Sequence, residues 1–415
     1  MEKKISVNVL FGVIFFVLFV SRILVLTGNY TLPIDPILLQ IIYIVLILVL
    51  LLIKSKGKIK LDTFKHKDFF KVALVLLLHT IVWGKILVNP MMIDLTTSQF
   101  KSQIMFVVIV ILTACATIKF DAVDTFIKSS FYALSFVLVV QLLSNFSDLN
   151  LSNIANIMSK SERTRANFGF GHYNTLGGAC LCNVILWSML KKENLEKLIT
   201  TVLMSISIIM LLCSASRSSL TGLIAFIVII AFEKFYNNNI SNRKKIAITF
   251  IKITFFGALI VFASNLDFDE ILIQSQRSLL FEKALPEFWS SGRVYEGLGY
   301  VSNTAYGTHL TPYTTYWLDN GYIYILISTG IIGFALILYA IYILLKNFYF
   351  SGNVFMKTKI FPILVVYMYT ALFEANLFNS GSITNYVYLV IFLAYIYNKE
   401  NIFKEKNIYT IININ

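Results

Sequence analysis

Four short stretches of this sequence place arginine, histidine or aspartate beside glycine or serine at the edges of long apolar runs. They are SERTRANFGFGHYNTLGG (161–178), LLCSASRSSL (211–220), SSGRVYEGLGY (290–300) and TYWLDNGYIYILISTGIIGF (315–334). The arginine guanidinium is a rigid, weakly hydrated fork that suits carboxylate and phosphate groups. A nearby carboxylate or imidazole can remove a proton from a hydroxyl. These residue types therefore indicate a site that binds an anion and assists proton transfer.

The elements that must position these residues are those of a membrane protein. Hydrophobic residues make up 57% of the 415 residues, charged residues make up 14%, and the mean hydropathy is +0.76. This composition leaves too little polar surface for a water-soluble protein. The net charge of +13 does not indicate a nucleic-acid partner, because the lysines cluster in short loops between apolar runs, where they orient membrane spans. The four cysteines lie in or beside apolar runs, and we interpret them as small core residues.

Twelve apolar runs are long enough to cross about 30 Å of hydrocarbon. They cover residues 5–26, 34–53, 69–88, 100–118, 123–143, 173–190, 198–214, 218–232, 246–263, 316–345, 360–376 and 383–397. We therefore predict an all-α integral membrane protein with about 12 transmembrane helices, forming one polytopic domain over residues 1–415. The tenth run exceeds the length of a span, so we expect it to be tilted, kinked or projecting from the bilayer.

Lysine and arginine are divided unequally between the alternating loops, with 22 in one set and 7 in the other. The positive-inside rule assigns the richer set to the cytoplasm, so we expect both termini to be cytoplasmic. Two extracytoplasmic loops, 144–172 and 264–315, are much longer than ordinary connections, and such loops are usually functional or disordered. Five of the seven arginines nevertheless lie on the outer side. The outer face therefore looks suited to an anion, unless these arginines pair with acids in the loops.

Arg217 lies in a serine-rich turn between two apolar runs. Residues 198–232, bracketed by Lys197 and Glu233, number 35, whereas two straight spans and a turn need about 40. We therefore expect the turn to be drawn toward the bilayer. An arginine that reaches hydrocarbon costs about 2.5–3.5 kcal/mol on insertion scales, which favours a functional role; snorkelling to lipid headgroups is the alternative.

The stretch 161–178 carries Arg163, Arg165 and His172 ahead of a glycine-rich helix start. The glycines permit tight turns and close approach to a ligand. His172 is either a donor to a sugar or phosphate oxygen or a capping residue at the membrane surface. The two arginines are either solvated charges or anion ligands.

Arg293 and Tyr300 lie in the second long loop, which precedes the tenth span. Arg293 and Glu296, at i and i+3, could form a surface ion pair worth less than about 1 kcal/mol. Spacing alone therefore leaves the role of Arg293 open. We assign Tyr300 to substrate binding.

Asp319 and Asn320 precede the tenth run. Either residue can cap the helix that follows, and one cap needs only one of them. With Tyr322 and neighbouring aromatic residues they form a hydrogen-bonding rim typical of carbohydrate contact. Gly330 and Gly333, further along the run, indicate a notch for close helix packing.

Glu374 lies at the outer end of the eleventh run. An ionisable group at membrane depth needs a partner. We expect that partner to be an outer arginine.

Together these stretches resemble the Wzy-type polysaccharide polymerases of the O-antigen ligase/polymerase superfamily. The resemblance rests on GFGHYNTLG (169–177), SASRSSLTGL (214–223), GRVYEGLGY (292–300) and DNGYIYILISTGIIG (319–333). It implies a GT-C-like glycosyltransferase of the bacterial cytoplasmic membrane that works without a metal or other cofactor. The implied reaction joins undecaprenyl-pyrophosphate-linked oligosaccharide repeats at the outer face, with polyprenyl pyrophosphate leaving and a sugar hydroxyl attacking. The donor and acceptor glycolipids, membrane lipid, a flippase and a chain-length regulator are the implied partners.

The resemblance also implies a donor site made by arginines. Arg217 and Arg293 would hold the pyrophosphate and stabilise the charge that develops as the glycosidic bond breaks. Arg163 or Arg165 would assist them.

The base is less closely defined by the resemblance. Asp319 would remove the proton of the acceptor hydroxyl or orient that hydroxyl, and His172 and His309 are rival bases. Ligases of the superfamily commonly carry a histidine where this chain has Asp319. That departure favours a polymerase and leaves the identity of the base open.

Two other functions are compatible with the sequence. One is a ligase that transfers finished glycan to a different acceptor. The other, from a different class, is a flippase for lipid-linked oligosaccharides or another transporter, since many carriers have twelve spans with both ends inside. A carrier should have broken helices with ionisable residues near the bilayer midplane, whereas we interpret the spans of this chain as uninterrupted.

Overall fold

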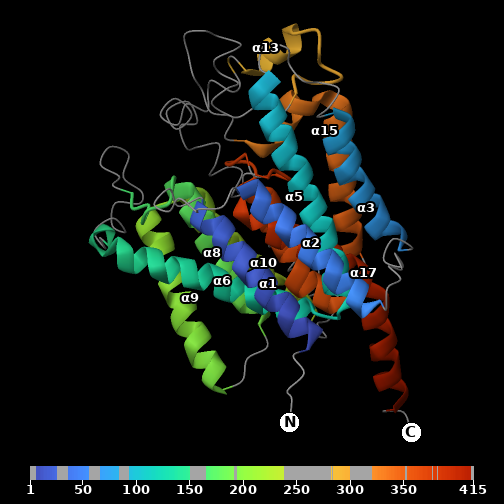
Figure 1. Ribbon diagram of the computed structural model, residues 1–415. Coiled ribbons are helices and arrows are strands. Elements are labelled where there is room, and N and C mark those ends of the chain that lie inside the picture. Colours follow the sequence, from blue (N-terminus) through green and yellow to red (C-terminus); the bar gives the residue numbers. More distant parts are fainter. Residues whose placement is uncertain are drawn as a thin grey trace. The chain divides into compact units, whose positions relative to one another are not determined.

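The computed structural model describes residues 6–25, 36–55, 66–83, 93–149, 165–190, 194–237, 282, 284–299, 320–350, 353–375, 377–380 and 382–412. Every secondary-structure element in these ranges is a helix (Figure 1). The predicted α-helical fold class is therefore confirmed for this part of the chain.

Eleven of the twelve predicted apolar runs fall on helices in the described ranges. In chain order these helices are α1 (Val7–Val25), α2 (Pro36–Lys54), α3 (Lys67–Leu78) continued by the π-helical turn η2 (His79–Trp83), α5 (Ile93–Lys119), α6 (Val123–Ser144), α8 (Tyr173–Met189), α9 (Asn194–Ser214), α10 (Arg217–Asn237), α15 (Gly321–Phe348), η6 (Met356–Ile360) continued by α16 (Phe361–Thr370), and α17 (Ile383–Ile412). The ninth run, 246–263, lies outside the described residues. Two short helices, η4 (Phe146–Asp148) and α13 (Leu285–Ser290), fall within the two long predicted loops.

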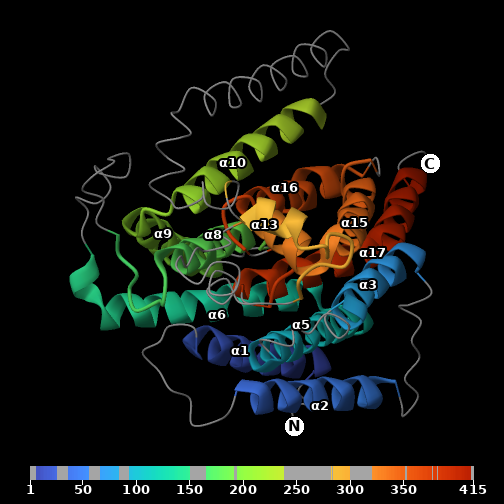
Figure 2. The ribbon, with the colours of Figure 1, turned by 90° about the horizontal axis from the view of Figure 1, so that it is seen from above.

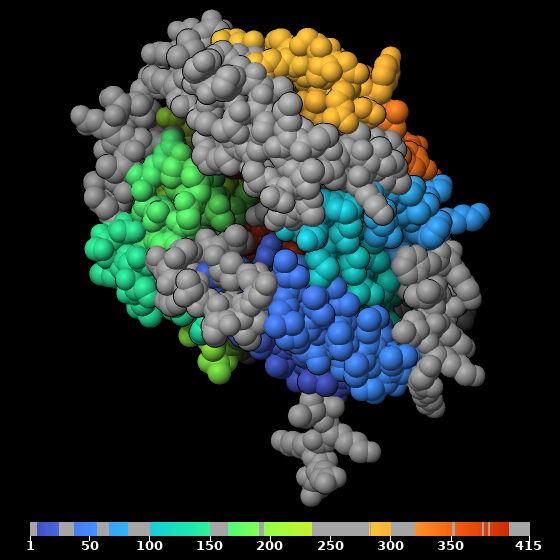
Figure 3. All heavy atoms as spheres, turned by 45° about the horizontal axis from the view of Figure 1, so that its top comes forward, coloured from blue at the N-terminus to red at the C-terminus, as the bar shows by residue number. Residues whose placement is uncertain are grey.

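Six of the described helices are long and apolar enough to cross a membrane: α1, α2, α5, α6, α9 and α15. Their outward surfaces are apolar too. Figure 3 shows α2 in blue on the surface, and all of its exposed side chains except Lys54 are Ile, Leu or Val. A surface of this kind is unfavourable in water and favourable in hydrocarbon. The chain is thus a multi-pass membrane protein, while twelve spans and a GT-C-like arrangement stay predictions.

The chain forms two compact units. Unit 1 comprises Met1–Leu74, Met105–Leu223 and Ser380–Asn415, and unit 2 comprises Val75–Ile104 and Ile224–Asn379.

Unit 1 is a helix bundle centred on α6 and α8. Helix α6 packs against α1, α8 and α9, and α17 packs against α6 and α8 (Figure 2). The fully buried Asn183 side chain of α8 donates hydrogen bonds to Ser135 of α6 (2.9 Å) and to Ser207 of α9 (2.8 Å). These two bonds hold three helices around one polar point in an otherwise apolar interior.

Unit 2 is built around α15, which contacts η2, α13, α16 and η6. Helix α15 is broken at Gly330, where φ is 66° and ψ is −173°. The kink expected for the tenth run is therefore confirmed, and the interpretation of the spans as uninterrupted is wrong for this helix.

The loop 294–299 completes the hydrogen bonding of the broken helix. In an unbroken helix, Ile331 and Ile332 would donate to the carbonyls of Ile327 and Ser328. Instead the loop supplies both partners, through the pairs Leu298 N to Ile327 O (2.8 Å), Gly299 N to Ser328 O (2.9 Å), Ile331 N to Val294 O (2.9 Å) and Ile332 N to Tyr295 O (3.3 Å). The main-chain groups at the break are thus satisfied without water, as hydrocarbon surroundings require.

Gly330 is required by this close approach. A Cβ atom at position 330 would overlap the carbonyl of Tyr295, and its positive φ disfavours any side chain. The predicted notch for another helix at Gly330 is therefore a notch for the loop main chain.

We predict that Gly330→Ala destabilises the protein more than Gly292→Ala does. Gly292 also has a positive φ, 73°, but a Cβ there would meet no atom within 4 Å. The Gly292 variant should lose about 1–2 kcal/mol from backbone strain alone, whereas the Gly330 variant adds a clash with the loop and should lose more than about 3 kcal/mol. Unfolding of the purified protein by SDS, followed by circular dichroism, measures both. Equal losses would contradict a tight fit of the loop in the break.

Candidate functional site

Two of the four predicted stretches meet in unit 1. The Ala166 N–H donates to the Cys213 carbonyl at 3.1 Å, which joins the segment before α8 to the last turn of α9. Phe168 and Phe170 of that segment are 0% and 1% exposed, so their burial anchors it to the bundle. We call this contact the 166–213 junction.

The segment reaches the junction through a tight turn. Phe168 and Gly169 have φ values of 45° and 76°. Asn167 stabilises the turn, because its side-chain oxygen accepts from the Gly169 N–H (3.2 Å) and its carbonyl accepts from the Phe170 N–H (2.9 Å). A left-handed Phe is strained, and the complete burial of its ring offsets the strain.

The junction places two arginines on neighbouring backbone. Arg165 directly precedes Ala166, and Arg217 begins α10 after the two-residue turn that follows α9. Both arginine side chains are exposed. The structure therefore places the main chains of Arg165 and Arg217 on either side of the 166–213 junction.

The serines of the turn face inward, away from the side taken by Arg217. Ser214, Ser216, Ser218 and Ser219 are all buried. The Ser214 hydroxyl donates to the Leu211 carbonyl (2.7 Å), and Ser216 Oγ lies 3.3 Å from Ser218 Oγ and 3.2 Å from Ser219 Oγ. The hydroxyls that the sequence places around Arg217 therefore stabilise the turn.

Gly177 fits this turn against α8. A Cβ atom at position 177 would lie 2.6 Å from Ser216 Cβ and 2.9 Å from Ser219 Oγ. The close approach that this glycine permits is to protein. Among the described residues, no atom lies within 4 Å of a Cβ position on the adjacent Gly178.

The helices around Arg217 are longer than the apolar runs indicate. Helices α9 and α10 have 21 residues each, which corresponds to about 31 Å apiece. They continue past Lys197 and Glu233, the two charges that were taken as the ends of the spans. The two charges therefore do not mark the helix ends, and the depth of the turn in the bilayer stays a prediction.

His172 and Arg165 are both held at the start of α8. His172 is the N-cap, and its Nδ1 accepts from the Asn174 N–H at 3.2 Å. The Arg165 guanidinium lies over the ring of Tyr173, with Cζ 4.0 Å from the ring centroid, a cation–π geometry. Capping, one of the two alternatives for His172, is thus observed, while a role as donor or base stays a prediction.

Arg293 lies in unit 2 at the start of the loop that completes the break in α15. Its Nε donates to Glu296 Oε1 at 2.9 Å, in an ion pair whose side chains are 34% and 51% exposed. The ion pair allowed by the i, i+3 spacing is therefore present. It uses one of the five N–H groups of the guanidinium, and the described residues supply no hydrogen-bond acceptor for the other four.

Asn320, Tyr322 and Glu374 come together at the start of α15. Asn320 is the N-cap, accepting from the N–H groups of Tyr322 and Ile323 at 3.0 Å each. Its amide donates to the Leu372 carbonyl (3.0 Å), and the Tyr322 hydroxyl donates to the Met368 carbonyl (3.0 Å).

The half-buried Glu374 lies in the turn after α16, and its carbonyl oxygen would be 3.2 Å from a Cβ on Gly321. These contacts attach the start of α15 to the end of α16. The proposed sugar-binding roles of Asn320 and Tyr322 would therefore have to operate alongside structural hydrogen bonds.

Four predicted site residues, Asp319, His309, Arg163 and Tyr300, lie outside the described residues.

Two further polar residues stand out that the four stretches do not include. His79 is 3% exposed, and its Nε2 lies 3.2 Å from Thr329 Oγ1, one residue before the break. Arg22 lies in the last turn of α1. A charged or titratable residue inside an apolar run is the sequence signal for both.

Comparison with protein-family models and with curated proteins found no match for this chain. Within the described residues, no group of three or more His, Cys, Asp or Glu side chains is arranged to hold a metal ion. All four cysteines are buried and free, which confirms their interpretation as core residues.

We predict that Gly177→Ala lowers the stability of the protein and that Gly178→Ala does not. The Gly177 variant should lose about 1–3 kcal/mol, because its methyl group overlaps the Ser216 side chain. The Gly178 variant should be neutral or gain about 0.5–1 kcal/mol, since alanine favours the helix. SDS-induced unfolding of the two purified variants, compared with wild type, measures the difference. A stable Gly177→Ala protein would show that α8 does not rest closely on the turn.

Proposed function

We propose that this chain is a glycosyltransferase that polymerises lipid-pyrophosphate-linked oligosaccharide repeats at the outer face of the bacterial cytoplasmic membrane, as Wzy-type polymerases do. The observation that carries the proposal is the 166–213 junction, which holds Arg165 and Arg217 on anchored backbone in a membrane protein. A pyrophosphate presents several oxygens, and arginine forks bind such oxygens in pairs. A fixed backbone keeps the forks in place while charge develops on the leaving group.

The position of Arg217 adds support. It is the first residue of α10, and the N-terminus of a helix carries a partial positive charge. A cation there is unfavourable by about 0.3–1 kcal/mol. A bound phosphate group would offset this cost, because negative charge is favourable at the N-terminus of a helix.

The proposed reaction breaks the bond between the anomeric carbon and the pyrophosphate oxygen, and forms a bond from the same carbon to the acceptor oxygen. The pyrophosphate leaves with the electron pair, and the arginines stabilise its negative charge. The acceptor hydroxyl loses its proton to a base, for which we propose Asp319, with His172 and His309 as alternatives. From the sequence we also propose that Arg293 and Arg163 bind the pyrophosphate. We propose substrate binding by four further residues: Tyr300, Asn320, Tyr322 and Glu374.

The N-cap at Asn320 bears on the assignment of Asp319. Helix capping was the competing explanation for an acid at position 319. Because Asn320 accepts from both N–H groups at the start of α15, capping does not account for the acid. This supports the proposal of Asp319 as base.

One observation favours a carrier as the second candidate. The break at Gly330 and the buried His79 beside it are features expected of transporters, in which broken helices surround the substrate. In this chain, however, the loop 294–299 occupies the hydrogen-bonding groups of the break. We therefore rank the carrier below the polymerase. The ligase, with the same donor chemistry, differs only in its acceptor.

We predict that Arg217→Ala and Arg293→Ala each slow polymerisation at least about 100-fold, the scale for losing one preorganised donor to a developing charge. The assay incubates purified protein in lipid vesicles with a lipid-pyrophosphate repeat unit and separates the products by size. Wild type should produce a ladder of glycans, and the two variants should not. Lys54→Ala, which removes an exposed cation at the end of α2, is the matched control and should keep the ladder.

The same vesicles distinguish the alternatives. Unchanged chain length in either arginine variant would remove the mechanism. Movement of the glycolipid between leaflets without any ladder would identify a carrier, and transfer to a different acceptor with no ladder would identify a ligase.

We predict that substitutions at residues 319 and 320 separate catalysis from capping. Asp319→Asn and Asp319→Ala should both lose the ladder with little change in stability. Asn320→Ala should lose about 1 kcal/mol of stability, because it removes the cap of α15. Product ladders and SDS unfolding of the same preparations give both readings. An active Asp319→Asn protein would exclude the carboxylate as base.

A further inference from the structure

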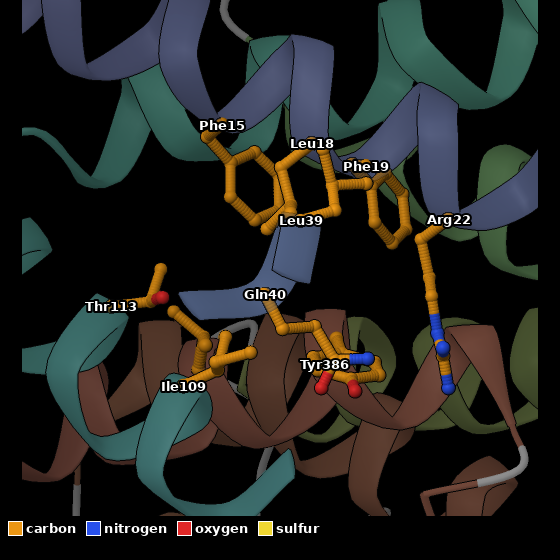
Figure 4. A pocket seen from close by; sticks show the side chains of 10 residues that line it. Phe15, Leu18, Phe19, Arg22, Leu39, Gln40, Ile109, Thr113 and Tyr386 are labelled. Carbon is orange, nitrogen blue, oxygen red and sulfur yellow. The ribbon is translucent and has the colours of Figure 1, made fainter. Parts of the chain in front are cut away.

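A pocket in unit 1 is lined by side chains of α1, α2, α5 and α17 (Figure 4). Its enclosed part is small, about 20 Å³, and most of its 490 Å³ of empty space is the open groove in front of that part. Most of its wall is hydrocarbon, including the rings of Phe15 and Phe19 on α1. A narrow apolar slot between membrane helices suits a hydrocarbon chain.

The polar groups of the pocket gather at one end of its helices. Arg22 is in the last turn of α1, while Gln40 and Tyr386 are within the first two turns of α2 and α17. Arg22 lies close enough to Tyr386 for its charge to act on the phenol. Thr113, further along the pocket on α5, has its hydroxyl 2.8 Å from the Tyr43 hydroxyl. The surface of the pocket is thus almost wholly apolar, with Arg22, Gln40 and Tyr386 near one end.

Arg22 is short of partners. Its Nε is buried, and no described residue accepts a hydrogen bond from it. The residues that line the pocket include no Asp or Glu. A buried donor without an acceptor is costly, especially in a charged group, so an anionic acceptor at this end of the pocket would be stabilising. The side chain of Gln40, which also lines the pocket, is 6% exposed.

We propose that this pocket binds an anionic glycerophospholipid of the outer leaflet, with one acyl chain along Phe15 and Phe19 and the phosphate at Arg22. Gln40 and Tyr386 are placed to donate to phosphate or ester oxygens. The distribution of lysine predicts that the end of α1 faces outward, which is where such a headgroup lies. A zwitterionic lipid would bring a second cation toward Arg22, so the net anionic lipid is preferred. Its lining residues include none of the arginines of the proposed polymerase, and the proposal does not rest on that function.

Native mass spectrometry of the purified protein, titrated with phosphatidylglycerol or with phosphatidylcholine of the same chains, tests the proposal. Arg22→Gln should weaken phosphatidylglycerol binding about five-fold, the effect of one cation near an anionic lipid, and should leave phosphatidylcholine binding unchanged. Arg22→Lys keeps the charge without the fork and should show a smaller loss. Leu39→Trp fills the pocket and should remove the same lipid while Arg22 is intact.

Lys54→Gln is the matched control, because it removes one charge from α2 at the end away from Arg22. An equal loss in Lys54→Gln would show a general charge effect and overturn the site. So would retention of the lipid in both Arg22→Gln and Leu39→Trp. Added undecaprenyl phosphate that displaces phosphatidylglycerol from wild type, but not from Arg22→Gln, would reassign the pocket to an isoprenoid lipid.

Discussion

A main-chain N–H or C=O group in hydrocarbon has no water to bind, and leaving one unpaired costs several kcal/mol. This constraint decides where the chain can depart from a regular helix. At Gly330 it does so only because the loop 294–299 supplies four main-chain hydrogen bonds. At the turn between α9 and α10, the Cys213 carbonyl accepts from Ala166 and buried serines satisfy one another. Each departure from helix is thus completed by another segment of the chain.

The charged residues proposed to act on substrate lie at these same departures. Arg217 follows the serine turn, Arg165 adjoins the 166–213 junction, and Arg293 begins the loop that enters α15. Side chains of a continuous helix in a bilayer must face lipid or protein. Side chains of an irregular segment can face a substrate instead. Because main-chain hydrogen bonds anchor the segments beside them, the arginines have a fixed base. Rigid placement of positive charge is what stabilisation of a departing pyrophosphate requires.

Arg22 illustrates a different use of the same side chain. It lies within a helix, its Nε is buried, and its surroundings are an apolar pocket. An arginine in that setting is better suited to hold a lipid phosphate for long periods than to act on a leaving group. The protein therefore has arginines on irregular backbone and an arginine on regular helix, and we propose a different ligand for each setting.

The sequence alone predicted the helices, because an apolar run that is long enough to cross the hydrocarbon of a membrane must be helical to pair its main-chain groups. Eleven predicted runs fall on described helices and Arg293 pairs with Glu296, since both features depend on residues close together in the chain. Helices α9 and α10 continue past Lys197 and Glu233, which were expected to mark the ends of the spans, because charged residues near a helix end do not mark where the helix stops. Only the tertiary structure decided that Gly330 receives a loop, that Gly177 rests on Ser216, and that Arg165 and Arg217 share one junction. These contacts join main-chain atoms and small side chains from distant segments. They cannot be predicted from residue types, because nearly every residue carries the same main-chain donor and acceptor.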